Sequence, residues 1–96
     1  MPAKIRRVVL DVLKPHDPSI IELSQRLAAQ PGVDGVNISI YEVDRKVENA
    51  KITIEGEHIQ YPTVLEVIEE MGGAIHSIDE VAAGKVLIED VITPQD

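Results

Sequence analysis

An internal repeat constrains the fold of this chain more than any other feature of its sequence. The segment PSIIEL at 18–23 recurs with the same apolar and polar pattern as PTVLEV at 62–67. At the same spacing upstream, the apolar residue Leu10 corresponds to Ile54. A proline followed by Ser or Thr, with Glu three residues later, is typical of a helix start. The repeat therefore predicts two copies of a strand–helix unit, each followed by a further strand.

Local patterns place the individual elements. Alternating apolar and polar residues indicate strands at 5–13, 36–41, 50–54 and 75–81, and apolar residues at helical spacing follow each repeated proline. The resulting order predicts an α+β fold, a ferredoxin-like βαββαβ sandwich with an antiparallel four-stranded sheet and two helices on one face. We expect a single domain over residues 1–96, with its core at about residues 4–84.

One apolar segment, KVLIEDVI at 85–92, remains after four strands are assigned. We interpret it as a C-terminal extension strand that either pairs with an edge of its own sheet or crosses to a neighbouring subunit. We favour subunit contact. The predicted contact residues are Val86, Leu87 and Ile88, together with Tyr41 from the second strand.

Composition narrows the class of function. The formal net charge of −8 repels phosphates, and Tyr41 and Tyr61 are the only aromatic residues for base stacking, so we expect no nucleic acid partner. The absence of cysteine excludes disulfides, thiolate nucleophiles and sulfur-ligated metals. No stretch has the length and hydropathy of a signal peptide or membrane span, so we expect a cytoplasmic protein without a membrane partner.

The segment HSIDE at 76–80 concentrates groups that are common in catalysis. In a regular strand, alternation would direct His76 and Glu80 to one face and Ser77 and Asp79 to the other. A nucleophile, its base and an orienting acid must be in contact with one another. We therefore expect a strand end here, no catalytic residues and no enzymatic activity.

Seventeen carboxylates make divalent cations candidate ligands. Calcium takes about six to eight oxygen ligands, and no EF-hand spacing occurs, so a site would have to be assembled from separate strands or subunits. The predicted metal ligands are Asp79, Glu80, Asp11, Glu42 and Asp44.

With both helices on one side, the opposite sheet face is expected to be open and of mixed charge. We interpret this face as an assembly surface or as the floor of a small-ligand site. His16 and His58 each lie near a strand–helix junction, and we interpret them as surface histidines rather than as a paired imidazole site. The residues of the open face are Arg7, Val9, Asp11, Asn37, Ser39, Tyr41, Asn49, Lys51, Thr53 and Glu55.

Four stretches, VVLDVLKPHDPSI, GVNISIYEVD, AKITIEG and HSIDEVAAGK, together resemble the archaeal family called domain of unknown function 211. The resemblance spans about residues 4–92. It implies a ferredoxin-like fold, an archaeal cytoplasmic protein, assembly into rings of several subunits, and calcium as a bound ion without indicating which carboxylates ligate it. It implies no established activity and no catalytic residues.

The predicted fold is also similar to regulatory modules of the amino-acid-sensing type. Such modules often bind ligands at subunit interfaces through the loop between the first strand and the first helix, which corresponds here to Lys14, His16, Asp17 and Ser19. Copper-chaperone domains share the fold but need a Cys-x-x-Cys loop, which this chain lacks. Likeness of fold alone is a weak argument for function.

Two functions follow from these observations. The first is a non-enzymatic, homo-oligomeric binding or scaffold protein, with divalent cations bridging carboxylates between subunits. It predicts that the substitutions Leu87→Asp and Ile88→Asp break the assembly. The alternative is a small-metabolite-sensing module that binds an effector at residues 14–19, and it predicts that the effector raises the melting temperature.

Overall fold

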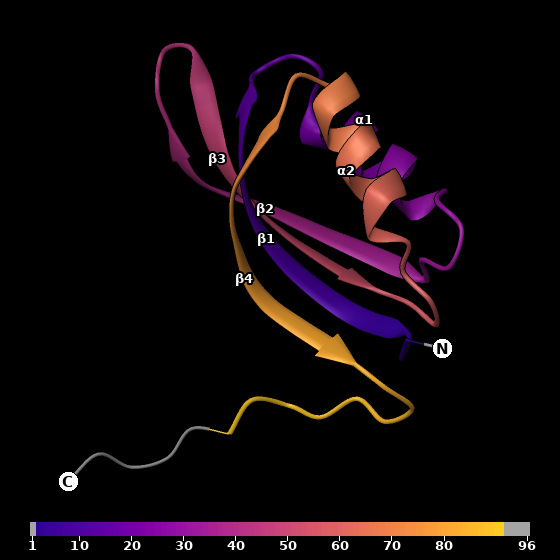
Figure 1. Ribbon diagram of the computed structural model, residues 1–96. Helices are drawn as coiled ribbons and strands as arrows, with labels where there is room; N and C mark the ends of the chain where they lie inside the picture. Colours follow the sequence, from indigo (N-terminus) through magenta and orange to yellow (C-terminus); the bar gives the residue numbers. More distant parts are fainter. Residues whose placement is uncertain (1, 92–96) are drawn as a thin grey trace, which may run out of the picture.

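The computed structural model describes residues 2–91 and confirms the ferredoxin-like fold (Figure 1). The strands form one antiparallel sheet in the order β2-β3-β1-β4, and both helices cover the same face of it (Figure 1). Neither helix is long and apolar enough to cross a membrane within the described part of the chain. The elements are β1 (Ile5–Pro15), α1 (Ile20–Ala28), β2 (Gly35–Val43), β3 (Val47–Glu55), α2 (Tyr61–Glu70) and β4 (Ala74–Ala83).

The core lies between the sheet and the helices and is almost entirely aliphatic. Burial of each Val, Leu or Ile side chain contributes about 1.5–3 kcal/mol, so a chain with two aromatic residues can still build a stable core. Tyr61 packs against this core from its margin. The buried members are Val8, Leu10 and Val12 of β1, Ala50, Ile52 and Ile54 of β3, Leu23 and Leu27 of α1, Val64, Val67 and Ile68 of α2, and Ile59 and Met71.

The repeat predicted from the sequence corresponds to β1–α1 and β3–α2. Pro62 lies in the first turn of α2, where a missing N–H costs nothing. Ser19 is the N-cap residue of α1, but its hydroxyl makes no capping hydrogen bond, and its carbonyl accepts from Leu23 N at 3.1 Å. The two units are therefore alike in topology, although their helix starts are not held by side-chain caps.

Two β-bulges in β4 overturn the alternation expected for residues 75–81. The pairing of β4 with β1 shifts between Ile75 and Ser77, and again between Ile78 and Glu80. Each bulge inserts an extra residue and reverses the side of the sheet to which the following residues point. As a result, Ile75, Ile78 and Val81 pair with the core-facing residues of β1, whereas Ser77 and Glu80 pair with open-face residues.

A further bulge lies in β2, where the pairing with β3 shifts between Ile40 and Glu42. The extra residue is Tyr41, whose hydroxyl reaches across the sheet to the carboxylate of Asp11 on β1. Tyr41 therefore lies over the open face, as predicted, but it is held there by a bond within the chain.

Residues 85–91 form no strand and no ladder with either edge of the sheet, whereas an extension strand was expected. They form an irregular C-terminal arm that turns back after β4 and runs below the sheet (Figure 1). Ile92, the last residue of the predicted strand, lies outside the described residues. Residues 85–91 therefore do not pair with an edge of the chain's own sheet.

Candidate functional site

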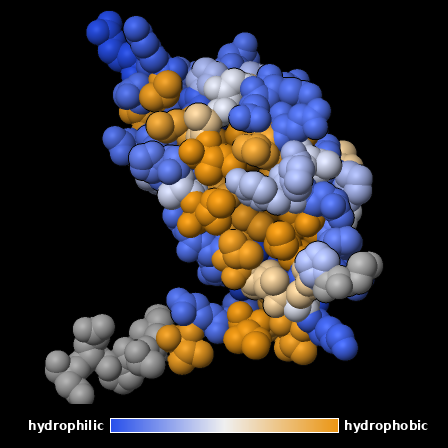
Figure 2. All heavy atoms as spheres, viewed as in Figure 1, coloured by the Kyte–Doolittle hydropathy of each residue, from blue (hydrophilic) through white to orange (hydrophobic). Residues whose placement is uncertain are grey.

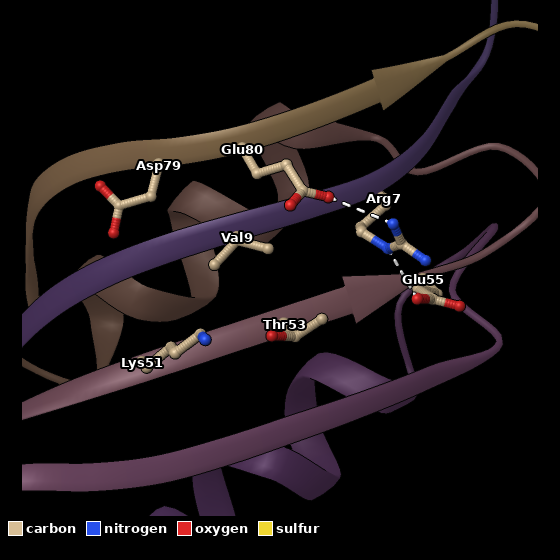
Figure 3. Close-up of a pocket in the computed structure, with 7 residues that line it drawn as sticks. All are labelled: Arg7, Val9, Lys51, Thr53, Glu55, Asp79 and Glu80. Carbon is tan, nitrogen blue, oxygen red and sulfur yellow. Dashed lines mark hydrogen bonds and ion pairs between the residues drawn. The ribbon is translucent and has the colours of Figure 1, made fainter. Parts of the chain in front are cut away.

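A hollow of about 530 Å³ lies on the open face of the sheet (Figure 3). Three adjacent strands build it: β3 on one side, β4 on the other, and β1 as the floor between them. Its walls carry both signs of charge, as the sequence predicted for this face. The lining residues are Arg7 and Val9 of β1, Lys51, Thr53 and Glu55 of β3, and Asp79 and Glu80 of β4.

Arg7 closes one end of the hollow and is bound by three carboxylates. Its Nε donates to Glu55 at 2.7 Å, and its Nη1 donates to Glu80 at 3.2 Å. Nη1 and Nη2 also grip Glu89 of the arm in a bidentate pair at 2.8 and 2.9 Å. The side chain is only 13% exposed, so the guanidinium is largely covered by its partners.

This network shifts the proton affinities of its members. The hydrogen bonds that Arg7 donates to Glu89, Glu55 and Glu80 raise the pKa of Arg7, and Arg7 in turn lowers the pKa of Glu89. Both shifts favour the charged forms, which attract each other. Arg7 therefore remains a cation with four of its five N–H donors in use, and Glu89 fastens the arm to the sheet.

The neighbouring Arg6 holds the start of the arm. Its Nη1 donates to the carbonyl of Lys85 at 3.0 Å and to that of Gly84 at 3.4 Å, and its Nε donates to Gly56 at 3.1 Å. Arg6 and Arg7 thus hold two different points of the arm, Arg6 at its start and Arg7 at Glu89. The arm is thus held in place by polar contacts.

The apolar side chains of the arm point outward. Val86, Ile88 and Val91 are 69%, 76% and 76% exposed, whereas Leu87 is half-buried. Ile78 and Val81 of β4 are also more than half exposed, because the helices do not extend over this part of the edge strand. Figure 2 shows apolar side chains gathered over the face of β4 and α2 and along the base, where the arm runs.

The predicted effector loop is largely occupied by its own contacts. Lys14 is 1% exposed, and its ammonium donates to Glu48 and to the carbonyl of Pro15, both at 2.7 Å. His16 contacts the other oxygen of Glu48 at 3.3 Å and the carbonyl of Asp44 at 2.9 Å. Asp17 and Ser19 are exposed and make no side-chain hydrogen bond within residues 2–91. The structure thus brings Lys14 and His16 together on Glu48, without Asp17 or Ser19.

These contacts also shift pKa values. The hydrogen bond to Glu48 raises the pKa of His16, and the hydrogen bond from Lys14 lowers the pKa of Glu48. His16 therefore ties the loop after β1 to the β2–β3 hairpin most strongly when its ring is protonated.

The five predicted metal ligands do not converge. Among the residues that the structure describes, no group of three His, Asp or Glu side chains could hold a metal ion. Asp11 accepts from Tyr41, whose pKa it raises, and Asp44 accepts the amides of Lys46 and Val47 at 2.9 and 3.0 Å. Glu42 lies on β2, while Asp79 and Glu80 line the hollow. A site shared between subunits stays a prediction.

Alternation predicted that Glu80 would lie on the opposite face from Ser77 and Asp79. This prediction is wrong, because the bulges in β4 place all three residues on the open face. Ser77 Oγ donates to Asp79 Oδ1 at 2.6 Å, and Asp79 lines the hollow beside Glu80. His76 lies exposed on the edge strand. The bulges thus bring three of the four polar groups together, and within residues 2–91 the hydroxyl of Ser77 bonds only to Asp79.

His16 and His58 lie near opposite ends of β1, because His58 precedes Ile59, whose amide bonds to the carbonyl of Ile5 at 2.9 Å. At about 3.3 Å per residue, the length of β1 separates the two imidazoles by roughly 30 Å. They form no paired site in one chain.

Sequence reasoning missed Glu48, Arg6 and Glu89. Glu48 lies in a polar hairpin. Arg6 precedes Arg7, which was assigned to the open face, and Glu89 follows the predicted contact residues 86–88. Their importance comes from partners 34 to 82 positions away in the chain. The alternation of β1 does place Arg7 on the open face, but it does not identify its carboxylate partners.

Comparisons with known proteins agree on one assignment. Residues 6–96 match the family model DUF211, described as an uncharacterized ArCR family. The chain is also 54% identical over 92 residues to the uncharacterized protein MJ0319 of Methanocaldococcus jannaschii, an alignment that covers 96% of this chain and 95% of that protein. Neither description names a reaction, a ligand or a partner.

Proposed function

The chain belongs to the uncharacterized archaeal family DUF211, and from that premise we propose that it is a non-enzymatic, homo-oligomeric scaffold protein whose C-terminal arm contacts a neighbouring copy. The observation that carries the proposal is the arm itself. It presents Val86, Ile88 and Val91 to solvent while Arg6 and Arg7 hold its backbone and Glu89 in place.

The energetics support a contact through the arm. Covering a Val or Ile side chain contributes about 1.5–3 kcal/mol, and three such side chains close together on an anchored segment are costly to leave in water. The anchoring also matters, because an arm that is already ordered loses less conformational entropy on binding. The arm is therefore prepared for a partner surface.

The edge strand β4 adds to this surface. Ile78 and Val81 extend the apolar area beside the arm, and the outer edge of β4 is not paired in the sheet. Its two bulges interrupt the regular spacing that a further strand would need. We therefore propose that copies meet through side chains of β4 and the arm rather than through a continuous intermolecular sheet.

Divalent cations are a second element of the proposal. Asp79, Glu80, Glu89 and Asp90 lie around a smaller hollow between β4 and the arm, and the chain carries a net charge of −8. Carboxylates from two copies would repel each other unless a cation lay between them. Calcium, or another hard divalent cation, would lower that repulsion at a contact made by the arm.

The arm can be tested with a double substitution, Val86→Asp with Ile88→Asp. Light scattering after gel filtration should give an oligomer for the unchanged protein and a monomer for this variant. Ile21→Asp is the matched control, because Ile21 is an equally exposed aliphatic residue on α1, and it should leave the oligomer intact. An oligomer that survives the double substitution contradicts the role of the arm.

Native mass spectrometry with and without chelator tests the cation. An oligomer that carries extra mass, and that loses both the mass and its assembly in chelator, supports cation bridging. An oligomer unaffected by chelator contradicts the bridging and leaves the apolar contact. A monomer under every condition contradicts the scaffold function itself.

A further inference from the structure

The hollow on the open face is chemically divided between its two side walls. On β3, Lys51 makes no ion pair and the hydroxyl of Thr53 makes no hydrogen bond within residues 2–91. Both side chains point into the hollow from the same face of the strand (Figure 3). One wall therefore offers a cationic donor and a hydroxyl whose bonding capacity is unused.

The opposite wall, on β4, offers carboxylate oxygens. Asp79 uses Oδ1 to accept from Ser77, and Glu80 uses Oε2 to accept from Arg7, so the second oxygen of each carboxylate is left for another donor. The bulge between Ile78 and Glu80 is what brings these consecutive residues to the same hollow. Bulges often occur where a strand redirects side chains toward a functional site.

The floor between the walls is apolar. Val9 of β1 lies between them and is 9% exposed (Figure 3). Neighbouring strands are about 4.8 Å apart, so the backbones of β3 and β4 lie about 10 Å apart across β1. A molecule that reached both walls would therefore carry its charges at two ends and lay hydrocarbon over Val9.

The charges exclude simpler ligands. Arg7 serves a free anion poorly, because Glu55, Glu80 and Glu89 already occupy four of its five N–H donors and neutralise its charge. The three lining carboxylates outnumber the two lining cations, which disfavours a plain anion such as phosphate. A plain diamine would place one of its ammonium groups beside that of Lys51.

We propose that this hollow binds a small zwitterion with an amine and a carboxylate at opposite ends of a short hydrocarbon chain, as in an ω-amino acid or lysine. Lys51 and Thr53 bind the carboxylate, Asp79 and Glu80 bind the ammonium group, and Val9 contacts the hydrocarbon. All these residues belong to one chain, although Asp79 and Glu80 also border the smaller hollow proposed above for a bridging cation.

The first test is a titration of isotope-labelled full-length protein with 6-aminohexanoate, followed by the backbone amide signals in nuclear magnetic resonance. Saturable shifts should centre on Val9, Thr53 and Glu80, with a dissociation constant at or below about 1 mM, a range typical of a few charged contacts. Hexanoate and pentylamine each lack one of the two charged groups, and each should bind at least about tenfold more weakly.

Two substitutions separate the walls. Lys51→Met and Asp79→Asn should each weaken binding of 6-aminohexanoate by about tenfold or more. Lys46→Met, at an exposed position in the β2–β3 hairpin, should leave binding unchanged. The spectra of the variants also report whether each remains folded.

Four results would overturn the proposal. Shifts absent at millimolar 6-aminohexanoate would show that the hollow is only a solvated face. Equal binding of pentylamine would make it a cation site, and equal binding of hexanoate would make it an anion site. Shifts confined to residues 14–19 would favour the loop after β1 instead.

Discussion

Each end of β1 carries a basic residue that pairs with carboxylates, but one of these clusters is on the open face and the other is buried. At one end, Arg7 lies on the open face and binds carboxylates from β3, β4 and the arm. At the other end, Lys14 is almost fully buried and shares Glu48 with His16. The two clusters hold different parts together: the first fastens the arm to the open face, and the second joins the end of β1 to β3.

The burial of each cluster determines how much stability a substitution in it removes. Breaking a buried ion pair leaves an uncompensated charge, whereas an exposed ion pair can exchange its partner for water. We therefore expect changes at Glu48 to alter global stability. Changes at Glu89 should mainly alter the position of the arm.

The largest effect is expected for Glu48→Ala. The ammonium of Lys14 would keep only the carbonyl of Pro15, and the free energy of unfolding should fall by about 3 kcal/mol, as measured by urea denaturation. Glu57→Ala, at an exposed carboxylate, is the control. A fall of less than about 0.5 kcal/mol for Glu48→Ala would contradict the importance of the buried pair.

A compensating double substitution sharpens this prediction. Lys14→Met combined with Glu48→Leu removes both charges and should recover most of the lost stability, because a well-packed apolar pair can replace a buried ion pair. Failure to recover would mean that packing around Glu48, rather than the unpaired ammonium, caused the loss.

A smaller, local effect is expected for Glu89→Ala. The arm would lose its bidentate bond to Arg7, so trypsin should cleave after Lys85 several times faster while the urea midpoint changes little. Asp90→Ala is the matched control, because Asp90 forms no ion pair in the described part of the chain. Equal cleavage rates for the two variants would show that Glu89 does not hold the arm.

Acid should release the same contact. Arg7 lowers the pKa of Glu89 below its ordinary value of 4.5, so the contribution of this pair is complete above pH 4.5 and is lost as pH falls through the lowered pKa. Cleavage by pepsin near the arm should therefore accelerate in this acidic range for the unchanged protein. The Glu89→Ala variant should be cleaved rapidly over the whole acidic range. If the ratio of the two cleavage rates does not change with pH, protonation of Glu89 does not release the arm.

The smallest effect is expected for His16. Its pKa is raised above 6.5 in the folded chain, so its contribution to stability is complete below pH 6.5 and is lost as pH rises through the raised pKa. The urea midpoint of the unchanged protein should decrease slightly over that range. His16→Asn should remove this decrease, and His58→Asn controls for the loss of an exposed imidazole elsewhere.

The sequence predicted the fold well because its signals are local and repeated. The matched segments at 18–23 and 62–67 and the alternation of β1 and β3 require only neighbouring residues to be read. The candidate site was predicted less well. Alternation fails in β4 because a bulge is a mismatch between two strands, and the sequence of one strand does not disclose it.

Lys14 and Leu87 illustrate the same limit. Lys14 was predicted to bind an effector in the loop after the first strand, yet its amine is buried because Glu48 arrives from β3. Leu87 was expected to act with Val86 and Ile88, but the arm is twisted so that Leu87 is half-buried and its neighbours point outward. For Lys14 the decisive partner is 34 positions away in the chain.

By itself, the sequence determined the order of the elements, the aliphatic core and the mixed charge of the open face, because periodicity and composition act over short distances. The tertiary structure alone decided which charges meet. Arg7 gathers carboxylates from three segments, and β4 turns Asp79 and Glu80 toward Lys51 across β1. Such contacts depend on strand register, which is set by the packing of the whole sheet against its helices.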